Sequence, residues 1–306
     1  MKQVLINGKK ESAIIQGCMR IADKSQKEVE AIIKTDLDNG ISFFDHADIY
    51  GDGRCEENFG KVLKANPSLR DKITLQSKCG IKMHGIKEFN STCEHVVKSV
   101  DGILKRLQTD HLDYLAIHRA DALVEPEELA KAFDTLKSQG KVLNFGVSNH
   151  NSMQIELYKK FIKQPIVINQ MQMSLMHTGM VDQGLTVNNY IDGAICRDGL
   201  ILDYCRLNDI TIQCWSPFFA GFFEDVFVDN PKFPKVNECL QKYATKYGVT
   251  KNAIAVAWLL RHPANMQVII GTTTPSRIIA SAKAQDFTLT HEEWYDLYAS
   301  TGNPVL

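Results

Sequence analysis

The stretch 43–53 places ionisable side chains directly after an apolar run. It reads Phe-Phe-Asp-His-Ala-Asp-Ile-Tyr-Gly-Asp-Gly and contains Asp45 and Tyr50. Lys78 and His118 stand at the ends of two later apolar runs. Because α/β proteins place their chemistry where buried strands end and loops open, we expect these four side chains to share one site. Taken alone, the stretch is equally typical of an acidic turn with an exposed tyrosine.

These four residue types suit the donation of a proton to a carbonyl oxygen. A free phenol has a pKa of about 10 and is a weak acid near neutral pH. We expect the ammonium of Lys78 to lower the pKa of Tyr50, and Asp45 to hold Lys78 and compensate its buried charge. His118, if neutral, donates a hydrogen bond that orients the carbonyl. Such an acid, without a metal or an activated nucleophile, calls for a bound reductant, and a nicotinamide cofactor supplies hydride.

Short apolar runs alternate with amphipathic helical segments along the chain. This alternation implies parallel strands with right-handed crossovers, and eight such units favour a closed barrel over an open sheet. We therefore predict an α/β fold: a single (β/α)8 TIM barrel domain over residues 1–306, with a short N-terminal extension and long loops after strands 6 and 7. We expect the active site at the carboxyl ends of the strands. The predicted strands are 13–15, 41–45, 73–78, 112–118, 142–147, 166–170, 210–215 and 268–270.

Several helix boundaries and faces are also predicted. A capping box at 25–28 starts a helix whose apolar stripe is interrupted by Asp36. Ser91 is expected to open a helix that runs to about residue 107. Met153 and Leu157 are expected to face inward from the helix after the fifth strand.

The composition limits the class of partner. The 306 residues carry a net charge of −1 and are 44% hydrophobic, so we expect no nucleic-acid partner and no membrane partner. No apolar run is long enough for a signal peptide or a bilayer span, which predicts a cytoplasmic location. The eight cysteines form no Cys-x-x-Cys pair, so we expect reduced thiols and no metal site. A monomer or weak homo-oligomer that acts on a small molecule is expected.

The ordered motifs resemble those of the aldo-keto reductases. Four residues are similar to the catalytic tetrad of that family. They are Asp45 and Tyr50, the latter followed by Gly51, then Lys78, and then His118, which follows Tyr-Leu-Ala-Ile. Further similar segments follow in the same order and cover almost the whole chain. They are Gly140 to Asn149, Asn169-Gln170, Trp215-Ser216-Pro217 and Gly271 to Ile278.

This resemblance implies an oxidoreductase that reduces an aldehyde or ketone with NADPH, with Tyr50 as the proton donor. It implies that Arg277 contacts the ribose 2′-phosphate, so that NADPH is preferred over NADH, and that Thr272 and Thr273 help to bind the anion. In many family members a lysine stands at the position of Gly271, which leaves the preference resting mainly on Arg277. The expected cofactor residues are Ser148, Asn149, Gln170, Trp215, Ser216, Pro217, Gly271, Thr272, Thr273 and Arg277.

Specificity is expected to come from the loops over the barrel mouth. Arg20, Phe218 and Phe219 are the candidate substrate residues. Seven apolar residues lie in the predicted loops after strands 6 and 7: Met173, Met176, Met180, Phe218, Phe219, Phe222 and Phe223. They are interpreted either as a wall of the substrate pocket or as lid packing unrelated to substrate. The carboxyl tail, 298–306, is a candidate cover for the same mouth.

Two other functions remain open from the sequence. One is a nucleotide-sensing regulatory subunit that binds NADPH and turns over little, against which the complete set of four site residues argues. The other is a class I aldolase with Lys78 as a Schiff-base nucleophile. The pairing of Asp45 with this lysine argues against the aldolase.

Overall fold

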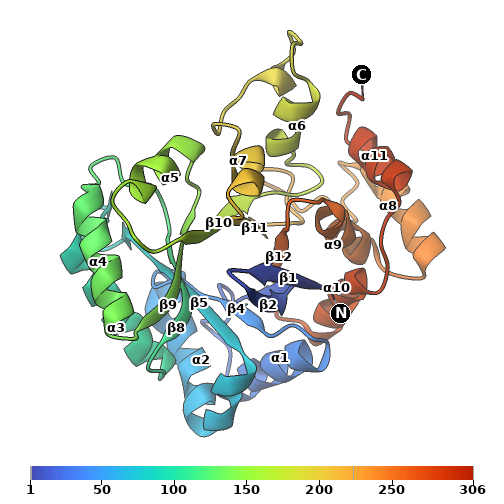
Figure 1. Cartoon of the computed structure of the whole chain (residues 1–306). Helices are drawn as coiled ribbons and strands as arrows, with labels where there is room; N and C mark the ends of the chain where they lie inside the picture. Colours follow the sequence, from blue (N-terminus) through green and yellow to red (C-terminus); the bar gives the residue numbers. More distant parts are fainter. Residues whose placement is uncertain (1, 223, 306) are drawn as a thin grey trace.

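Eight parallel strands close into a barrel in the computed structural model (Figure 1), which describes residues 2–222 and 224–305. The strands follow one another in chain order around the barrel, and the last, β12, closes it by pairing with the first, β3. The barrel strands are β3 (Ile14–Gly17), β4 (Phe43–Asp45), β5 (Thr74–Cys79), β8 (Leu112–Ile117), β9 (Val142–Ser148), β10 (Ile166–Gln172), β11 (Thr211–Trp215) and β12 (Gln267–Ile270). The predicted α/β barrel is confirmed, and each predicted strand overlaps one of these.

Helices cover the outside of the barrel (Figure 1). Most connect one strand to the next, as right-handed β-α-β units require. They are α1 (Gln26–Asp38), α2 (Arg54–Ala65), α3 (Cys93–Leu107), α4 (Pro126–Ser138), α5 (Ser152–Lys159), α6 (Gly179–Leu185), α7 (Ile201–Leu207), α8 (Pro234–Tyr247), α9 (Lys251–Arg261), α10 (Pro275–Ala282) and α11 (His291–Ser300). No helix among the described residues is long and apolar enough to span a membrane.

The N-terminal extension is a β-hairpin that closes the amino-terminal end of the barrel. Strands β1 (Gln3–Ile6) and β2 (Lys9–Ser12) pair antiparallel. Val4 and Ile6 pack on apolar side chains from inside the barrel. Glu11 is buried and accepts hydrogen bonds from the hydroxyls of Thr74 and Tyr114 at 2.8 and 3.2 Å. Ligands therefore enter from the opposite end, where the strands finish.

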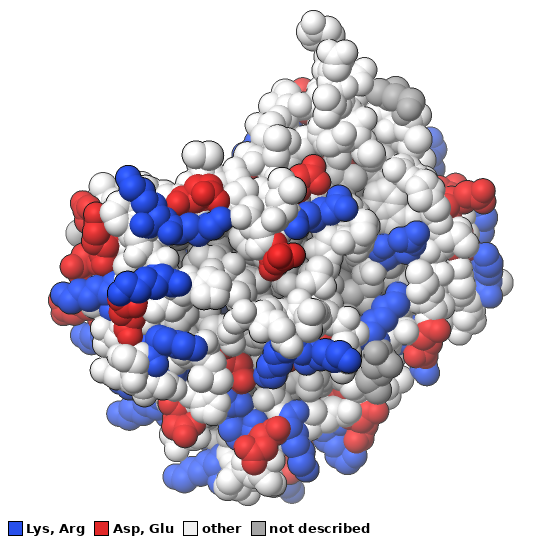
Figure 2. Space-filling model, viewed as in Figure 1, with Lys and Arg blue, Asp and Glu red and all other residues white. Residues whose placement is uncertain are grey.

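The loops after β10 and β11 are long, as predicted. The first contains α6 and a short 3-10 turn, η3 (Asp192–Ala194), and it projects beyond the barrel (Figure 1, yellow). On the face that Figure 2 shows, basic and acidic side chains are interspersed, in keeping with the net charge of −1.

The structure corrects two of the predicted helix details. Met153 and Leu157 of α5 are exposed by 71% and 44%, whereas Ile155 and Tyr158 are buried. The inward face is set by Tyr158, whose hydroxyl lies 3.3 Å from a ring nitrogen of His150. Thr92, and not Ser91, caps α3, since the Thr92 hydroxyl accepts a hydrogen bond from the backbone amide of His95 at 3.4 Å.

Some elements were not predicted. Helix α2 and helix α11 are missing from the sequence-based assignment, as are the hairpin β1–β2 and a second hairpin, β6 (Ile81–Lys82) with β7 (Glu88–Phe89). Helix α11 packs Trp294 face to face on Trp258 of α9, with ring centroids 4.8 Å apart. Both indole N–H groups donate to backbone carbonyls across this contact.

Asp36, which interrupts the apolar stripe of α1, is fully buried. Neither of its side-chain oxygens has a hydrogen-bond partner among the described residues. Burial raises the pKa of Asp36 to about 8. The carboxyl group is therefore neutral near neutral pH, which avoids an uncompensated charge in the core.

We expect this carboxyl to make stability fall as pH rises from about 4 to about 8. In that window the unfolded chain has lost the Asp36 proton and the folded chain still holds it, so rising pH favours unfolding. Asp36→Asn should flatten the curve of unfolding free energy against pH over this window, measured by urea denaturation. Asp38→Asn, on the exposed side of the same helix, is the control and should leave the slope unchanged. An unchanged slope in Asp36→Asn would contradict the assignment.

Candidate active site

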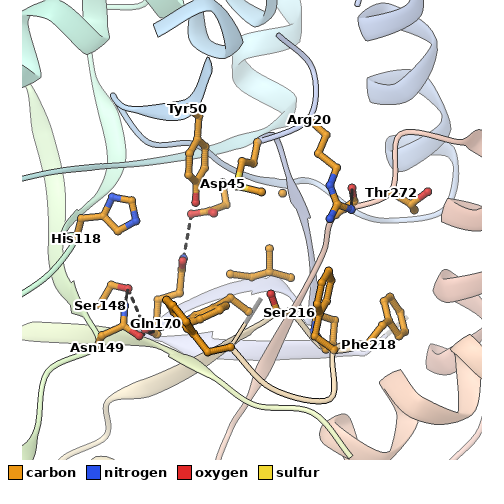
Figure 3. Close-up of a pocket in the computed structure, with 18 of the residues that line it drawn as sticks. Arg20, Asp45, Tyr50, His118, Ser148, Asn149, Gln170, Ser216, Phe218 and Thr272 are labelled. Carbon is orange, nitrogen blue, oxygen red and sulfur yellow. Dashed lines mark hydrogen bonds between the residues drawn. The ribbon is translucent and has the colours of Figure 1, made fainter. Parts of the chain in front are cut away.

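A cavity of about 560 Å³ opens at the carboxyl ends of the barrel strands (Figure 3). Its lining comes from the strand ends and the loops that follow them. The lining residues include Arg20, Asp45, Ile49, Tyr50, Ile81, His118, Arg119, Ser148, Asn149, Gln170, Trp215, Ser216, Pro217, Phe218, Phe219, Phe222, Asn252, Gly271, Thr272, Arg277 and Ser281.

A buried ion pair lies at the base of this cavity. The Lys78 Nζ of β5 lies 2.6 and 2.7 Å from the two carboxylate oxygens of Asp45, the last residue of β4. It also donates to the backbone carbonyl of His46 at 2.8 Å. The Lys78 side chain has no exposed surface and that of Asp45 has 3%. Three acceptors thus satisfy the three donors of the ammonium, which a buried lysine requires.

Tyr50 lies above this pair. The Lys78 Nζ is 5.0 Å from the centre of the Tyr50 ring. Burial raises the pKa of the Tyr50 phenol and outweighs Lys78, which acts to lower it. Lys78 acts to lower the pKa of Tyr50, as predicted. The prediction that the pKa is lowered overall is wrong for this structure. Burial likewise acts to lower the pKa of Lys78, but Asp45 and Tyr50 outweigh it and the net shift is upward.

His118 follows β8 on the far side of Tyr50. The two ring centroids are 6.0 Å apart at an angle of 84°, and both side chains point into the cavity (Figure 3). Burial, together with the charges of Lys78 and Arg119, holds the pKa of His118 well below its usual range. Its Nδ1 is buried without a partner among the residues described. The histidine is therefore neutral, as the sequence-based role requires.

The position of Tyr50 depends on a tight loop. Gly51 has φ +56°, and a Cβ there would lie 2.6 Å from the Cβ of Ala22, so no larger residue fits without moving the loop. His46 is buried against Phe59 and is not part of the cavity lining, and burial lowers its pKa to about 3. Its contribution is the backbone carbonyl that holds Lys78.

Polar side chains from β9 to β11 form the opposite wall. The Ser148 hydroxyl donates to the backbone carbonyl of Gln170 at 2.9 Å and accepts from the Asn149 amide at 2.8 Å. The Trp215 indole N–H donates to the Asn149 oxygen at 3.2 Å. The Gln170 amide nitrogen donates to Asp45 at 3.0 Å. Four predicted cofactor residues are thereby joined to one another and to the ion pair.

The predicted phosphate-binding segment lies at the other end of the cavity. Gly271, Thr272 and Arg277 line it, but Thr273 is absent from the lining that the described residues form. Arg277 is in the first turn of α10, and no partner of its guanidinium is found in the described parts of the chain. Arg20, predicted to face substrate, donates to the Gly271 carbonyl at 3.3 Å and so lies at this end (Figure 3).

An aromatic wall closes the substrate side. Phe218 and Phe219 line the cavity as predicted, and Phe222 packs edge-on against Trp215 with centroids 6.0 Å apart. Ile81 also lines it, from the start of the hairpin β6–β7. This wall leaves apolar space beside the polar base of the cavity.

Other residues of the predicted apolar set lie elsewhere. Met173, Met176 and Met180 belong to or pack on the hydrophobic core, which favours the alternative of packing unrelated to substrate. Phe223 lies outside the described residues. No described residue of the tail 298–305 lines the cavity. The tail instead contacts the α6 region, where the Tyr298 hydroxyl donates to Asp182 at 2.7 Å.

Arg119 and Asn252 line the cavity and were not predicted. Arg119 directly follows His118, and its guanidinium lies 5.8 Å from the centre of the Phe222 ring. It makes no ion pair with a carboxylate of the described chain. The position of Arg119 directly after His118, at the end of a predicted strand, could have identified it as a candidate site residue from the sequence. Asn252, in the first turn of α9, gave no such signal.

Comparison with known proteins identifies the family. Residues 13–300 match the Aldo/keto reductase family. The chain is 35% identical over 309 residues to the 6-dehydroglucose reductase of Agrobacterium fabrum, with 97% of each protein covered. It is 33% identical over 300 residues to the uncharacterized oxidoreductase YcsN of Bacillus subtilis, with 94% of each covered.

A solved structure has the same fold. The aldo/keto reductase from Klebsiella pneumoniae in complex with NADP and acetate superposes with a TM-score of 0.77 at 22% identity, covering 99% of this chain and 96% of that one. The family match and the relatives together establish that this chain belongs to the aldo/keto reductase family and is an oxidoreductase.

The ion pair gives a stability prediction. Asp45→Asn should destabilise the protein by about 3–5 kcal/mol, because it leaves the Lys78 charge buried and uncompensated. Adding Lys78→Met should restore much of the loss, since both charges are then removed. Asp101→Asn, which breaks a half-exposed pair with Lys141, should cost no more than about 1 kcal/mol. Urea denaturation of these three variants and of Lys78→Met alone measures this coupling, and additive effects of the two core substitutions would contradict it.

Proposed function

We propose that this protein reduces an aldehyde or ketone with NADPH, with Tyr50 as the proton donor to the carbonyl oxygen. The observation that carries the proposal is the placement of the Tyr50 phenol in the cavity, between the Lys78–Asp45 ion pair and a neutral His118. When bound, NADPH supplies the hydride that the protein's own side chains cannot supply.

The electrostatics of this arrangement suit proton donation. Because burial raises the pKa of Tyr50, the phenol holds its proton near neutral pH. Lys78 is a fixed cation 5.0 Å from the ring, and it favours the phenolate that forms when the proton leaves. A charge placed in advance stabilises the product of proton transfer without reorganisation of the site. His118, neutral and partly unpartnered, is available to orient the carbonyl.

The cavity also has the features that NADPH requires. Ser148, Asn149 and Gln170 present amide and hydroxyl groups at one end for the carboxamide, beside the flat ring of Trp215. At the other end α10 begins beside the cavity. Pro275 carries no N–H, and the Arg277 amide donates to the Thr274 carbonyl at 2.9 Å. The Ser276 amide has no acceptor among the described residues, which leaves it available to an anion. Arg20 and Arg277 add positive charge at that end.

The substrate side combines an apolar wall with a hydrogen-bonding cation. Arg119 carries a fork of N–H donors beside His118, and such a fork binds hydroxyl, carboxylate or phosphate oxygens. The similarity to a 6-dehydroglucose reductase supports a substrate of this polar kind. We therefore propose a small carbonyl compound that bears oxygen substituents near the reacting group.

The aldolase alternative fits the structure poorly. A Schiff base requires an unprotonated amine with access to substrate. The Nζ of Lys78 has no exposed surface, is bound to three acceptors, and its pKa is raised. The regulatory-subunit alternative is weakened because Asp45, Tyr50 and His118 line one cavity and Lys78 is paired with Asp45 at its base.

Tyr50→Phe should lower kcat by at least about a hundredfold, because it removes the general acid and leaves the cavity shape unchanged. Binding of NADPH, followed by tryptophan fluorescence, should stay within about twofold of the wild type. The exposed Tyr190→Phe is the control and should keep full activity. Steady-state rates with a panel of aldehydes, ketones and sugar aldehydes measure the effect. Wild-type rates in Tyr50→Phe would show that another group donates the proton.

Arg277→Leu tests the cofactor preference. Loss of a charge-assisted hydrogen bond to a 2′-phosphate should weaken NADPH binding about tenfold or more and leave NADH binding nearly unchanged. Lys283→Met, an exposed cation next to the end of α10, is the control and should change neither affinity. Equal losses of affinity for NADPH and NADH would show that Arg277 does not recognise the 2′-phosphate.

A further inference from the structure

The interior of this barrel contains a layer of glutamine side chains. Barrel interiors are ordinarily filled by branched apolar side chains. Here Gln76 on β5, Gln170 on β10, Gln213 on β11 and Gln267 on β12 point inward, and none has more than 3% of its surface exposed. Buried amides of this kind require partners for both their nitrogens and their oxygens.

The layer is joined by hydrogen bonds across and around the barrel. Gln76 and Gln213 bond reciprocally, nitrogen to oxygen, at 2.8 and 3.0 Å. Gln213 also donates to the Gln267 oxygen at 3.0 Å. The Gln267 nitrogen donates to the backbone carbonyl of Ser12 at 2.7 Å, which joins the network to the hairpin β1–β2.

The network reaches the ion pair through two amides. The nitrogens of Gln76 and Gln170 both donate to Asp45 Oδ1, at 2.7 and 3.0 Å. Each of these nitrogens gives its second proton to the Gln213 oxygen, at 2.8 and 3.2 Å. The Gln213 oxygen therefore accepts two hydrogen bonds and its nitrogen donates two, so its side chain is fully used.

This pattern fixes which way the Gln170 amide points. The ionised carboxylate of Asp45 and the Gln213 oxygen are both acceptors, so Gln170 must present its nitrogen to them. Its own oxygen then faces the cavity that Gln170 lines. An outward oxygen accepts a hydrogen bond from an N–H donor and repels a carbonyl.

We propose that Gln213 and Gln76 are positioning residues that hold the Gln170 oxygen toward the cofactor, so that the site recognises the amino group of the nicotinamide carboxamide. This proposal rests on the proposed use of NADPH. Gln213 is not part of the cavity lining that the described residues form, and it acts through Gln170. The same amides bond to Asp45, so the group that orients the cofactor and the group that anchors Lys78 share one network.

The test compares two nucleotides that differ only at this group. Oxidised NADP has a carboxamide, and its 3-acetylpyridine analogue has a methyl group in place of the amino group. The wild type should bind NADP about fivefold more tightly, the value of one neutral hydrogen bond. Gln213→Met keeps the length of the side chain and removes its amide, and it should reduce this preference to less than about twofold.

A matched variant separates positioning from general loss of structure. Gln267→Met removes an amide of the same layer whose partners among the described residues are Gln213 and Ser12, and it should keep the wild-type preference. Gln76→Met is a second variant. It removes both hydrogen bonds between Gln76 and Gln213 and should also reduce the preference for NADP over the analogue. Circular dichroism reports folding, and tryptophan fluorescence titration gives both dissociation constants. A merely structural residue would change both constants by the same factor.

Each outcome bears on the proposal. A wild type that prefers NADP, with the preference lost in Gln213→Met or Gln76→Met and kept in Gln267→Met, supports it. If the preference persists in both variants, or if the wild type binds the two nucleotides equally, the positioning role is wrong although the proposed function stands. If the wild type binds neither nucleotide, the proposed function itself is overturned.

Discussion

The buried ion pair between Asp45 and Lys78 is the interaction on which the rest of the site depends. An ammonium with no exposed surface is stable only where a carboxylate and further acceptors surround it. Two neighbouring strands meet this requirement. Asp45 on β4 lies opposite Gln76 on β5, and because side chains two residues apart share a face of a strand, Gln76 and Lys78 point to the same interior. The closed barrel thus places the Lys78 ammonium, the Asp45 carboxylate and the Gln76 amide next to one another in its interior.

The buried base of the site confines its charge to that pair, whereas the guanidinium groups of Arg20, Arg119 and Arg277 lie around the cavity above it. His118 is neutral because burial and neighbouring cations lower its pKa, and Tyr50 keeps its proton because burial raises its pKa. The glutamines are polar without charge and satisfy one another. The base of the cavity can therefore hold many hydrogen-bonding groups with one ion pair, so that only one buried cation, Lys78, must be compensated there.

The sequence predicted the barrel because each barrel strand contains an apolar run, and such runs at regular intervals specify parallel strands. It predicted the grouping of Asp45, Tyr50, Lys78 and His118 for the same reason, since strand order alone brings their ends together. It did not predict the glutamine layer. Along a single strand an inward amide has the same pattern as an outward one, and only the closure of the barrel decides between them.

The remaining discrepancies have similar physical causes. The net pKa of Tyr50 could not be predicted, because the extent of burial depends on loops that pack around it from distant parts of the chain. Met153 and Leu157 were assigned to the inward face of α5 by hydrophobicity, but the contact of Tyr158 with His150 sets the rotation of that helix. Arg20 lies near the phosphate segment because β3 is the neighbour of β12 in the closed barrel, where Ile14 pairs with Val268, 254 residues further along the chain.

The hairpin that closes the barrel also determines how the molecule can be attached to a surface or to another protein. The first described residues lead into β1, on the end of the barrel opposite the cavity, whereas residues 298–303 lie against the α6 region, which follows the carboxyl end of β10. A tag, dye or immobilising linker on the amino terminus therefore emerges from the closed end and leaves the cavity open to solvent. The same group on the carboxyl terminus would stand beside the loops that border the entrance.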